Sequence, residues 1–301
     1  MAKTNMKWSG WKTAIQRTES IASSNGDSVA EIQQRLNELL YDAGKVDGIV
    51  GMRTLCAAKW FFIRNGLGEN INWTQQSLNV LYSANAVKGL DYDIINWEPG
   101  EAPQAYLQKD PLWGDVAYDA SGTSGVETIG EAGCGPTAMA MVVSTLKTTA
   151  VVPPYLCDYA LDHGYRDPNG EYGTSDSFFR ACAEEYGLNS ARRNFITKEN
   201  ASSSARASNK ALFEDMKQFL ATDSLIIVSV GESPYTGGGH YLVVYDIDDT
   251  SNIEDAKVWV ADPNAYQNTD GLGAILPSSC CYTVRQWLDG YWAKRAIRIW
   301  P

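Results

Sequence analysis

Histidine is scarce in this sequence, whose 301 residues include only His163 and His240. A zinc hydrolase site built on histidine would need both of them and a third ligand of another type. The chain also lacks the H-E-x-x-H pattern, which places two histidines on one face of a helix. These absences argue against zinc catalysis, and we expect the protein to use neither a metal ion nor a cofactor.

Long apolar runs and an excess of basic residues are also missing. No apolar run approaches the roughly 20 residues that a membrane-spanning helix needs, so we expect no membrane insertion. The 36 acidic residues outnumber the 25 basic ones and give a formal net charge of -11. Because phosphate binding needs a basic face, this balance argues against nucleic acid as the main partner.

The cysteines follow no spacing that would indicate a disulfide framework or a zinc ribbon, and no C-x-x-C pair occurs. The first five residues lead into polar sequence without the apolar core of a secretory signal. We therefore expect reduced thiols. The six cysteines are Cys56, Cys134, Cys157, Cys182, Cys280 and Cys281.

The length of the chain favours two unequal domains over a single one. Residues 1–27 form a polar lead with a short predicted helix around 7–21, and residues 28–84 form a small helical domain. Glycines and prolines interrupt any periodicity over 85–104, which we interpret as a linker. The remainder, 105–301, is the larger domain.

Three short helices are predicted in the smaller domain. Ser28 and Glu31 fit a capping box at the start of the first, and apolar residues follow at helical spacing. A second helix is predicted over 53–64. A third is predicted over 74–83, with Thr74 as its cap.

A tight turn joins the first two predicted helices and contains Asp47, Gly48 and Gly51. Together with I-Q-Q-R-L at 32–36 and W-F at 60–61, this D-G-x-x-G turn resembles the peptidoglycan-binding helical domain found on many cell-wall hydrolases. The resemblance implies that the three turn residues take part in wall binding. From the residues alone, they need only build the turn.

The second half of the larger domain is rich in strands. Apolar and β-branched runs predict strands over 225–230, 240–245, 257–261 and 296–300. Helical patterns dominate the first half, which gives an α+β domain with helices followed by an antiparallel sheet. We interpret the polar, Ser- and Ala-rich segment 200–209 as an exposed loop.

Cys134 lies in the sequence Gly-Cys-Gly-Pro-Thr at the start of a predicted helix that is apolar on all sides. A helix of that kind is buried. Its positive N-terminal end lowers the pKa of a thiol, and the thiolate is the reactive nucleophile. Gly133 and Gly135 let a substrate backbone approach closely. These features favour a nucleophile over the more common buried and inert cysteine.

His240 follows three glycines, the last of them Gly239, and opens a continuous apolar strand. Such a strand is central in its sheet, so His240 would stand at its end with open space beside it. Asp262 ends the next predicted strand, and antiparallel pairing would bring its carboxylate beside His240 to orient the ring. A core histidine bonded to backbone groups is the alternative. His163 lies in a turn-like setting and is expected to have no catalytic role.

These motifs resemble the papain-like cysteine peptidases that are related to bacteriocin leader-processing enzymes. The resemblance covers roughly Tyr106 to the C-terminus and implies a triad of Cys134, His240 and Asp262. It includes Tyr-Gly-Thr at 172–174. The residues expected to bind substrate are Gly133, Gly135, Gly173, Thr174, Gly239 and Trp113.

The same family implies a glutamine that helps to form the oxyanion hole. Many papain relatives place it about six residues before the cysteine, a position that Thr128 occupies here. The sequence Q-x-D-P-x-W that begins at Gln108 is the better match. We predict that a glycine-rich excursion brings Gln108 back to the helix start, where its amide and the Cys134 N–H face the developing oxyanion. A surface glutamine is the alternative.

A wall-binding domain joined to a cysteine peptidase looks like a bacteriophage endolysin, which waits in the host cytoplasm and then acts on bacterial peptidoglycan. We expect a monomer that cleaves peptide bonds in wall stems or cross-bridges. Three alternatives stay open: an N-acetylmuramoyl-L-alanine amidase with the same triad, a glycan-cleaving lysozyme with paired carboxylates, and a wall-binding protein whose peptidase fold is inactive.

Overall fold

The structure is a computed structural model, in which the chain divides into two compact units, Ala2–Asp93 and Ile94–Pro301. The division falls inside the segment interpreted as a linker, and the helix expected around 7–21 lies outside the described residues. Within the described part of the chain, no helix is both long and apolar enough to cross a membrane. The structure describes residues 28–41, 43–50, 52–68, 71–89, 97–110, 113–118, 127–148, 151–166, 173–264 and 274–301.

The smaller unit contains the three helices that the sequence predicts: α2 (Val29–Glu38), α3 (Met52–Arg64) and α4 (Gln75–Leu81). The predicted capping box is confirmed, because the Glu31 side chain accepts from the Ser28 N–H at 2.6 Å while the Glu31 N–H donates to Ser28 Oγ at 3.2 Å. Thr74 caps α4 as predicted.

Aromatic packing fills the interior of the smaller unit. Trp73 is fully buried between two residues of α3: Phe61 stacks on it at 5.9 Å, and Phe62 meets it edge-on at 5.0 Å. Buried aromatic rings of this size contribute strongly to the stability of a core. The W-F pair quoted from the sequence belongs to this core, since Trp60 is 6% exposed.

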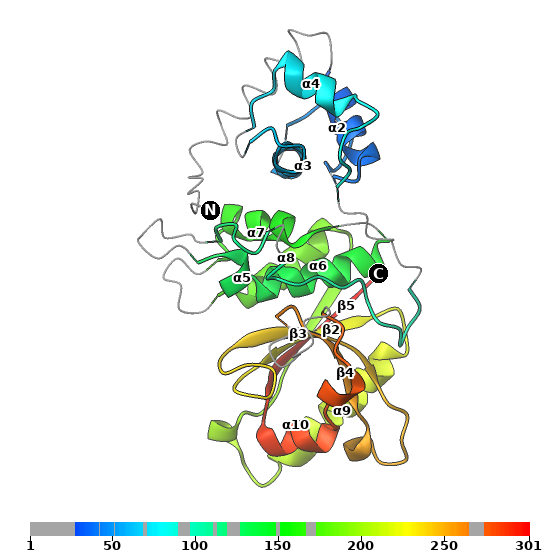
Figure 1. Cartoon of the computed structure of the whole chain (residues 1–301). Helices are drawn as coiled ribbons and strands as arrows, with labels where there is room; N and C mark the ends of the chain where they lie inside the picture. The colour runs from blue at the N-terminus through cyan, green and yellow to red at the C-terminus, as the bar shows by residue number, and fades with distance from the viewer. Residues whose placement is uncertain are drawn as a thin grey trace. The chain divides into compact units, whose positions relative to one another are not determined.

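The described residues of the larger unit include five strands in one antiparallel sheet, in the order β1-β5-β2-β3-β4. The α+β class expected from the sequence is confirmed (Figure 1). The strands are β1 (Asn189–Asn194), β2 (Leu225–Val230), β3 (His240–Ile247), β4 (Val258–Ala261) and β5 (Ala293–Trp300). The helices are α5 (Ile129–Ala132), α6 (Cys134–Leu146), α7 (Pro153–Asp162), α8 (Asp176–Glu185), α9 (Ala205–Leu220) and α10 (Val284–Gly290), with short 3-10 turns η1 (Lys198–Asn200), η2 (Ile253–Asp255) and η3 (Ser278–Cys280).

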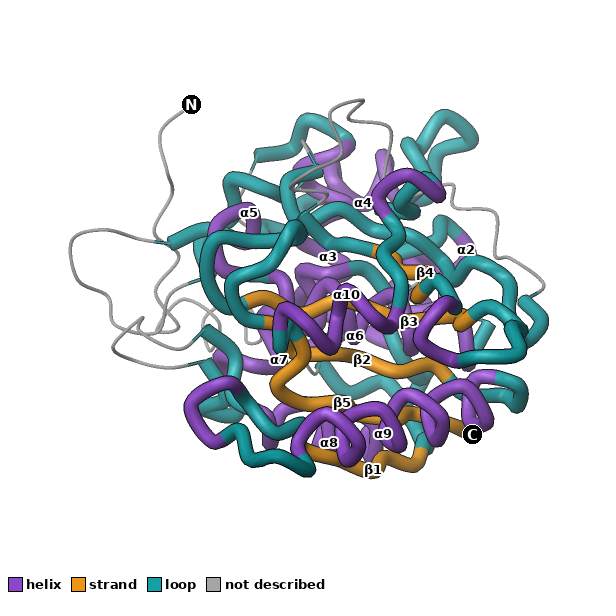
Figure 2. The backbone as a smooth tube through the Cα atoms, turned by 90° about the horizontal axis from the view of Figure 1, so that it is seen from below, coloured by secondary structure: helices purple, strands orange, loops and turns teal. Residues whose placement is uncertain are grey.

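The sheet lies between two layers of helices. Figure 1 shows α6, α7 and α8 on one side of it and α9 and α10 on the other, and Figure 2 gives the view from the α9 and α10 side. Alternate residues of a strand point to opposite faces. Accordingly, Ile226, Val228 and Val230 of β2 share one core with Phe213 of α9 and Trp287 of α10.

Two expectations for this unit need correction. The segment 200–209 is not an exposed loop throughout, because α9 begins at Ala205. Ala205 and Asn209 are buried. The Asn209 side-chain oxygen accepts from the Ile196 N–H at 2.8 Å, and its Nδ2 donates to the Ile196 carbonyl at 2.8 Å. Strand β1 was not expected, since its sequence is polar and it lies exposed at the sheet edge.

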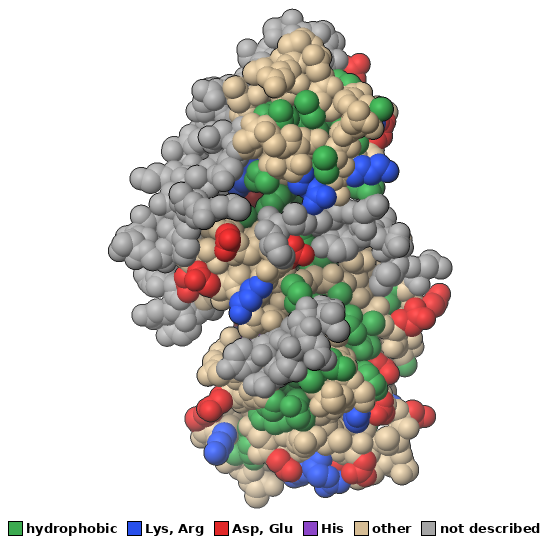
Figure 3. All heavy atoms as spheres, in the orientation of Figure 1, with side chains coloured by type: hydrophobic (Ala, Val, Ile, Leu, Met, Phe, Trp, Pro, Cys, Tyr) green, Lys and Arg blue, Asp and Glu red, His purple; other side chains and the backbone are tan. Residues whose placement is uncertain are grey.

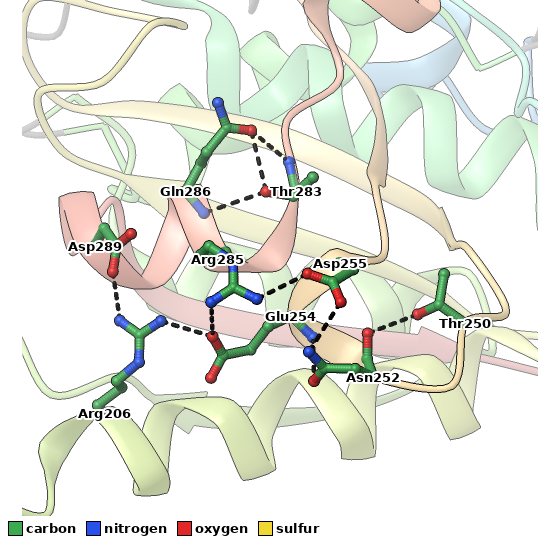
Figure 4. A network of polar contacts seen from close by, with 9 residues as sticks. All are labelled: Arg206, Thr250, Asn252, Glu254, Asp255, Thr283, Arg285, Gln286 and Asp289. Carbon is green, nitrogen blue, oxygen red and sulfur yellow. Dashed lines mark hydrogen bonds and ion pairs between the residues drawn. The ribbon is translucent and has the colours of Figure 1, made fainter.

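An ion network ties the outer helix layer together (Figure 4). Arg206 of α9 pairs with Glu254 of η2 at 2.8 Å and with Asp289 of α10. Arg285 of α10 reaches the same Glu254 at 3.0 Å and Asp255 at 2.7 Å. In the larger unit, the Lys and Arg side chains coloured on the face drawn in Figure 3 are interspersed with Asp and Glu.

Candidate active site

Cys134 is the first residue of α6, as the sequence predicts, and the residue is partly exposed while most of the helix behind it is buried. The Thr137 N–H donates to the carbonyl of Gly133, the residue before the helix, at 2.9 Å. A side chain at Gly135 would come within 3.1 Å of Thr174 Cβ. A side chain at Gly133 would meet Ile129, so both glycines permit close packing, and their contact with substrate stays a prediction.

His240 and Asp262 meet because β3 and β4 pair antiparallel. His240 Nε2 lies 2.7 Å from Asp262 Oδ1, and the side chains are 4% and 1% exposed. The Asn264 N–H also donates to Asp262 Oδ1 at 2.8 Å, which fixes the carboxylate. With Nε2 held by Asp262, the other ring nitrogen of His240 is free to serve the thiol.

The electrostatics of the pair favour charge separation. Burial by itself raises the pKa of the Cys134 thiol, but hydrogen bonds from His240, from the Tyr241 N–H and from the Gly135 N–H, with the charge of His240, lower it overall. Burial lowers the pKa of His240, and the bonds to Asp262 and Cys134 outweigh this and raise it to about 10. A thiolate beside an imidazolium is the resulting state near neutral pH.

Gln108 is buried rather than on the surface, with 3% of its area exposed. Its Nε2 donates to the carbonyl of Gly130 at 2.9 Å, four residues before Cys134, and its backbone N–H donates to the carbonyl of Pro263, which follows Asp262, at 2.8 Å. The second N–H of its amide is left for another acceptor. Thr128, at the usual glutamine position, instead caps α5 through Glu131.

The predicted excursion between Gln108 and Cys134 does return. The Gly130 N–H donates to the Gly114 carbonyl at 2.9 Å, and Ala117 pairs with Thr128. Trp113 is 1% exposed, and its Nε1 donates to the Leu107 carbonyl at 2.8 Å. Its indole therefore supports the segment that carries Gln108, and contact of Trp113 with substrate stays a prediction.

The other expected substrate residues surround the same place. Thr174 is buried and packs against Gly135, while Gly173 has a φ of +67°, a conformation that favours glycine. A side chain at Gly239 would meet nothing within 4 Å, so open space lies beside His240. His163 lies elsewhere, half-stacked on Tyr159 at 4.2 Å near the end of α7.

In the smaller unit, the turn is organised by Gln33, which is 1% exposed. Its Oε1 accepts from the N–H groups of Asp47 and Gly48 at 3.1 and 2.9 Å, and its Nε2 donates to the Ile49 carbonyl at 2.9 Å. Asp47 is exposed, Gly48 has a φ of +75°, and Gly51 lies outside the described residues. Gln33 stands in the I-Q-Q-R-L sequence, but nothing local indicated this role.

Sequence reasoning also missed the polar residues behind the site. Buried Arg166 pairs with Glu127 and donates to the carbonyls of Tyr118 and Gly173. The Tyr118 hydroxyl lies 2.7 Å from Thr174 Oγ1. These contacts join segments far apart in sequence, so no local pattern signals them. Among the described residues, no group of three or more His, Cys, Asp or Glu side chains fits a metal ion.

Comparison with known proteins supports the larger unit as a peptidase. A model of the Peptidase C39 like family matches residues 109–285, more than half of the chain, and includes Cys134, His240 and Asp262. No curated protein matches the chain significantly. A solved structure described as a "double glycine motif protease from AMS/PCAT transporter in complex with the leader peptide" shares 12% identity, over 56% of this chain and 84% of that chain, with a TM-score of 0.33.

That TM-score is too low to carry an argument, and the assignment rests on the family match, which spans the paired strands and the helix that bring the three catalytic candidates together. The chain belongs to the Peptidase C39 like family of cysteine peptidases.

Proposed function

We propose that this cysteine peptidase is a peptidoglycan hydrolase that cleaves peptide bonds in wall stems or cross-bridges, and that it acts as an endolysin. The observation that carries the chemistry is the meeting of Cys134 with His240, whose other nitrogen lies 2.7 Å from buried Asp262. The wall as substrate is supported by the resemblance of residues 28–84 to peptidoglycan-binding domains.

In the proposed reaction, the Cys134 thiolate attacks the carbonyl carbon of the scissile bond, and the carbonyl oxygen takes up negative charge. The Cys134 backbone N–H and the free N–H of Gln108 stabilise this oxyanion. The His240 imidazolium then gives its proton to the leaving amine as the bond to nitrogen breaks, which leaves a thioester. Water attacks the thioester with neutral His240 as base, releasing the acid and restoring the thiolate–imidazolium pair.

The smaller unit would hold the peptidase at an insoluble substrate and so raise its local concentration. The turn at Asp47 and Gly48 is exposed, and next to it Val46 and Ile49 are 49% and 67% exposed. Exposed apolar side chains beside a polar turn suit a sugar–peptide polymer, which presents both kinds of surface. As in other endolysins, release from the host cytoplasm would precede this contact.

Digestion of purified bacterial peptidoglycan with the full chain tests the proposal, with Cys134→Ala as the matched variant. We expect the wild type to release fragments with new peptide amino termini and Cys134→Ala to release none while sedimenting with the wall. Mass spectrometry identifies the bond: cleavage between the sugar and the first amino acid would mean an amidase. New reducing sugar ends, insensitive to thiol alkylation, would contradict the proposal and indicate a lysozyme.

Binding by the smaller unit is tested in the same assay with Asp47→Ala on the Cys134→Ala background. Removing this carboxylate breaks the contacts that shape the turn, to the Ile49 N–H at 2.9 Å and from Gln33 at 3.1 Å. We expect a larger share of the protein to stay in the supernatant. Glu38→Ala, on the exposed end of α2, is the control and should sediment like its parent. Equal sedimentation of all three proteins would contradict wall binding by this turn.

A further inference from the structure

Asp176 collects three partners at the start of α8. Its Oδ1 accepts from the Tyr241 hydroxyl at 2.9 Å, and its Oδ2 accepts from Arg295 at 2.5 Å and from Arg192 at 3.0 Å. The carboxylate is 15% exposed. A hydrogen bond to a carboxylate that also pairs with two guanidiniums is charge-assisted and among the stronger kinds.

These partners come from both sides of the active site. Asp176 belongs to α8, in the helix layer that also carries Cys134, whereas Arg192, Arg295 and Tyr241 lie on β1, β5 and β3 of the sheet. Tyr241 directly follows His240 on β3. The contact of Cys134 with His240 spans the same two layers, so any slip of the helices over the sheet would change it.

Tyr241 also reaches Cys134 through its own backbone. Its N–H lies near enough to the Cys134 sulfur to help lower the pKa of that thiol. Its hydroxyl lies 3.4 Å from the Thr174 carbonyl, and Thr174 packs against Gly135. The ring rests on Phe179 of α8 at 4.8 Å. Tyr241 is therefore fixed to the helix layer by its side chain, while its main chain lies beside the nucleophile.

We propose that Asp176 and Tyr241 form a clamp that fixes His240 and the Tyr241 N–H against Cys134, with both acting as positioning residues for thiol activation. The inference rests on the proposed roles of Cys134 and His240. Neither residue of the clamp touches the scissile bond. Its effect is geometric, since a misplacement of about 1 Å at a reacting pair costs on the order of 10²-fold in rate.

The test follows alkylation of Cys134 by iodoacetamide across pH, with the Cys134 peptide quantified by mass spectrometry. This readout needs no wall substrate and separates Cys134 from the other cysteines. The titratable groups that face the thiol are His240, with Asp262 behind it, Tyr118, Cys157 and Tyr241 itself. Tyr241→Phe leaves the others in place and removes only one hydroxyl.

We expect Tyr241→Phe to slow Cys134 alkylation by on the order of 10-fold near pH ~6. A displaced His240 stabilises the Cys134 thiolate less, so a larger share of the thiol stays protonated at this pH. Near pH ~10 the rates should converge, because an unassisted thiol then ionises too. Tyr245→Phe is the matched control, on the same strand and also buried, and should follow the wild-type profile. A Tyr241→Phe profile equal to the wild type would overturn the clamp, even if the melting temperature fell.

Asp176→Asn gives a second test that does not depend on the first variant folding. It keeps the size of the side chain and removes its charge, so its profile should shift in the same direction as that of Tyr241→Phe. An unshifted profile would overturn the clamp. A failure of the proposed function would give a different result. The wild-type protein would then leave peptidoglycan uncut while its Cys134 reactivity still depended on Tyr241. That outcome contradicts the wall as substrate and supports the clamp.

Discussion

Two polar networks in the larger unit differ in burial and in what they do. At the active site, the side chains of His240 and Asp262 are 4% and 1% exposed, and His240 lies between Asp262 and the nucleophile Cys134. In the outer helix layer, Arg206 and Arg285 are 42% and 48% exposed and share Glu254 (Figure 4). The two networks include carboxylates and cations at similar distances, yet the second is far more exposed to solvent.

The difference teaches that contact distance alone does not rank these interactions. Exposed ion pairs are screened by water and salt and contribute about 0.2–1 kcal/mol each. A buried pair interacts through a lower dielectric, and removing one partner leaves the other without compensation. We therefore expect substitutions in the buried network to abolish function and substitutions in the exposed network to cost little.

The largest contrast is expected between the two histidines. His240→Ala removes the proton carrier and the partner that holds the thiolate, so turnover should fall by at least about 10²-fold. His163→Ala should change turnover little, because this ring lies just after α7 and stacks on Tyr159. Initial rates of wall solubilisation measure both. An essential His163 would show that the buried network is not the catalytic one.

Gln108→Ala should have the next largest effect. If its free N–H faces the oxyanion, turnover should drop by ~10²–10³-fold with substrate binding nearly unchanged. Gln108→Glu is the sharper companion, since it keeps the size but places a carboxylate oxygen near the developing charge. Turnover and KM on a soluble wall peptide separate the two effects. Unchanged turnover in Gln108→Ala would leave this residue a structural link between Pro263 and Gly130.

The exposed network should give the smallest effect. Arg206→Gln breaks its pairs with Glu254 and Asp289, and the free energy of unfolding should fall by about 1 kcal/mol or less. Added salt should shrink the difference further, because it screens exposed charges. Denaturant unfolding at low and high salt provides the measurement. A fall of several kcal/mol in the free energy of unfolding, or a loss of activity, would contradict the expectation that the exposed network contributes little.

The sequence predicted those parts whose signals are local. β2 matches the predicted strand 225–230, α2 and α4 begin at their predicted caps, and Cys134 stands at the start of a buried helix. The pairing of His240 with Asp262 also followed, because strands that neighbour each other in sequence pair most simply in space.

The remainder depends on contacts that cross the fold. β1 shows no alternation of apolar residues, since its edge position and exposed faces impose none. The first turn of α9 reads as a polar loop until Asn209 meets the Ile196 backbone. Asp176 and Tyr241 are 65 residues apart, so only the folded chain reveals their bond.

The central claim is that Cys134 is a thiolate held by His240, and the direct measurement is the pH dependence of Cys134 alkylation in the wild type and in His240→Ala. The pKa of the Cys134 thiol is lowered in the wild type, so alkylation should be fast at pH values below the usual thiol pKa. The rate should fall only when acid protonates the thiolate. In His240→Ala the largest counterweight to burial is lost and only the N–H groups of Tyr241 and Gly135 remain, so the pKa of the Cys134 thiol should rise. Peptidase activity should decline as pH rises through about 10, where His240 loses its proton. Identical alkylation profiles in the two proteins would contradict the account.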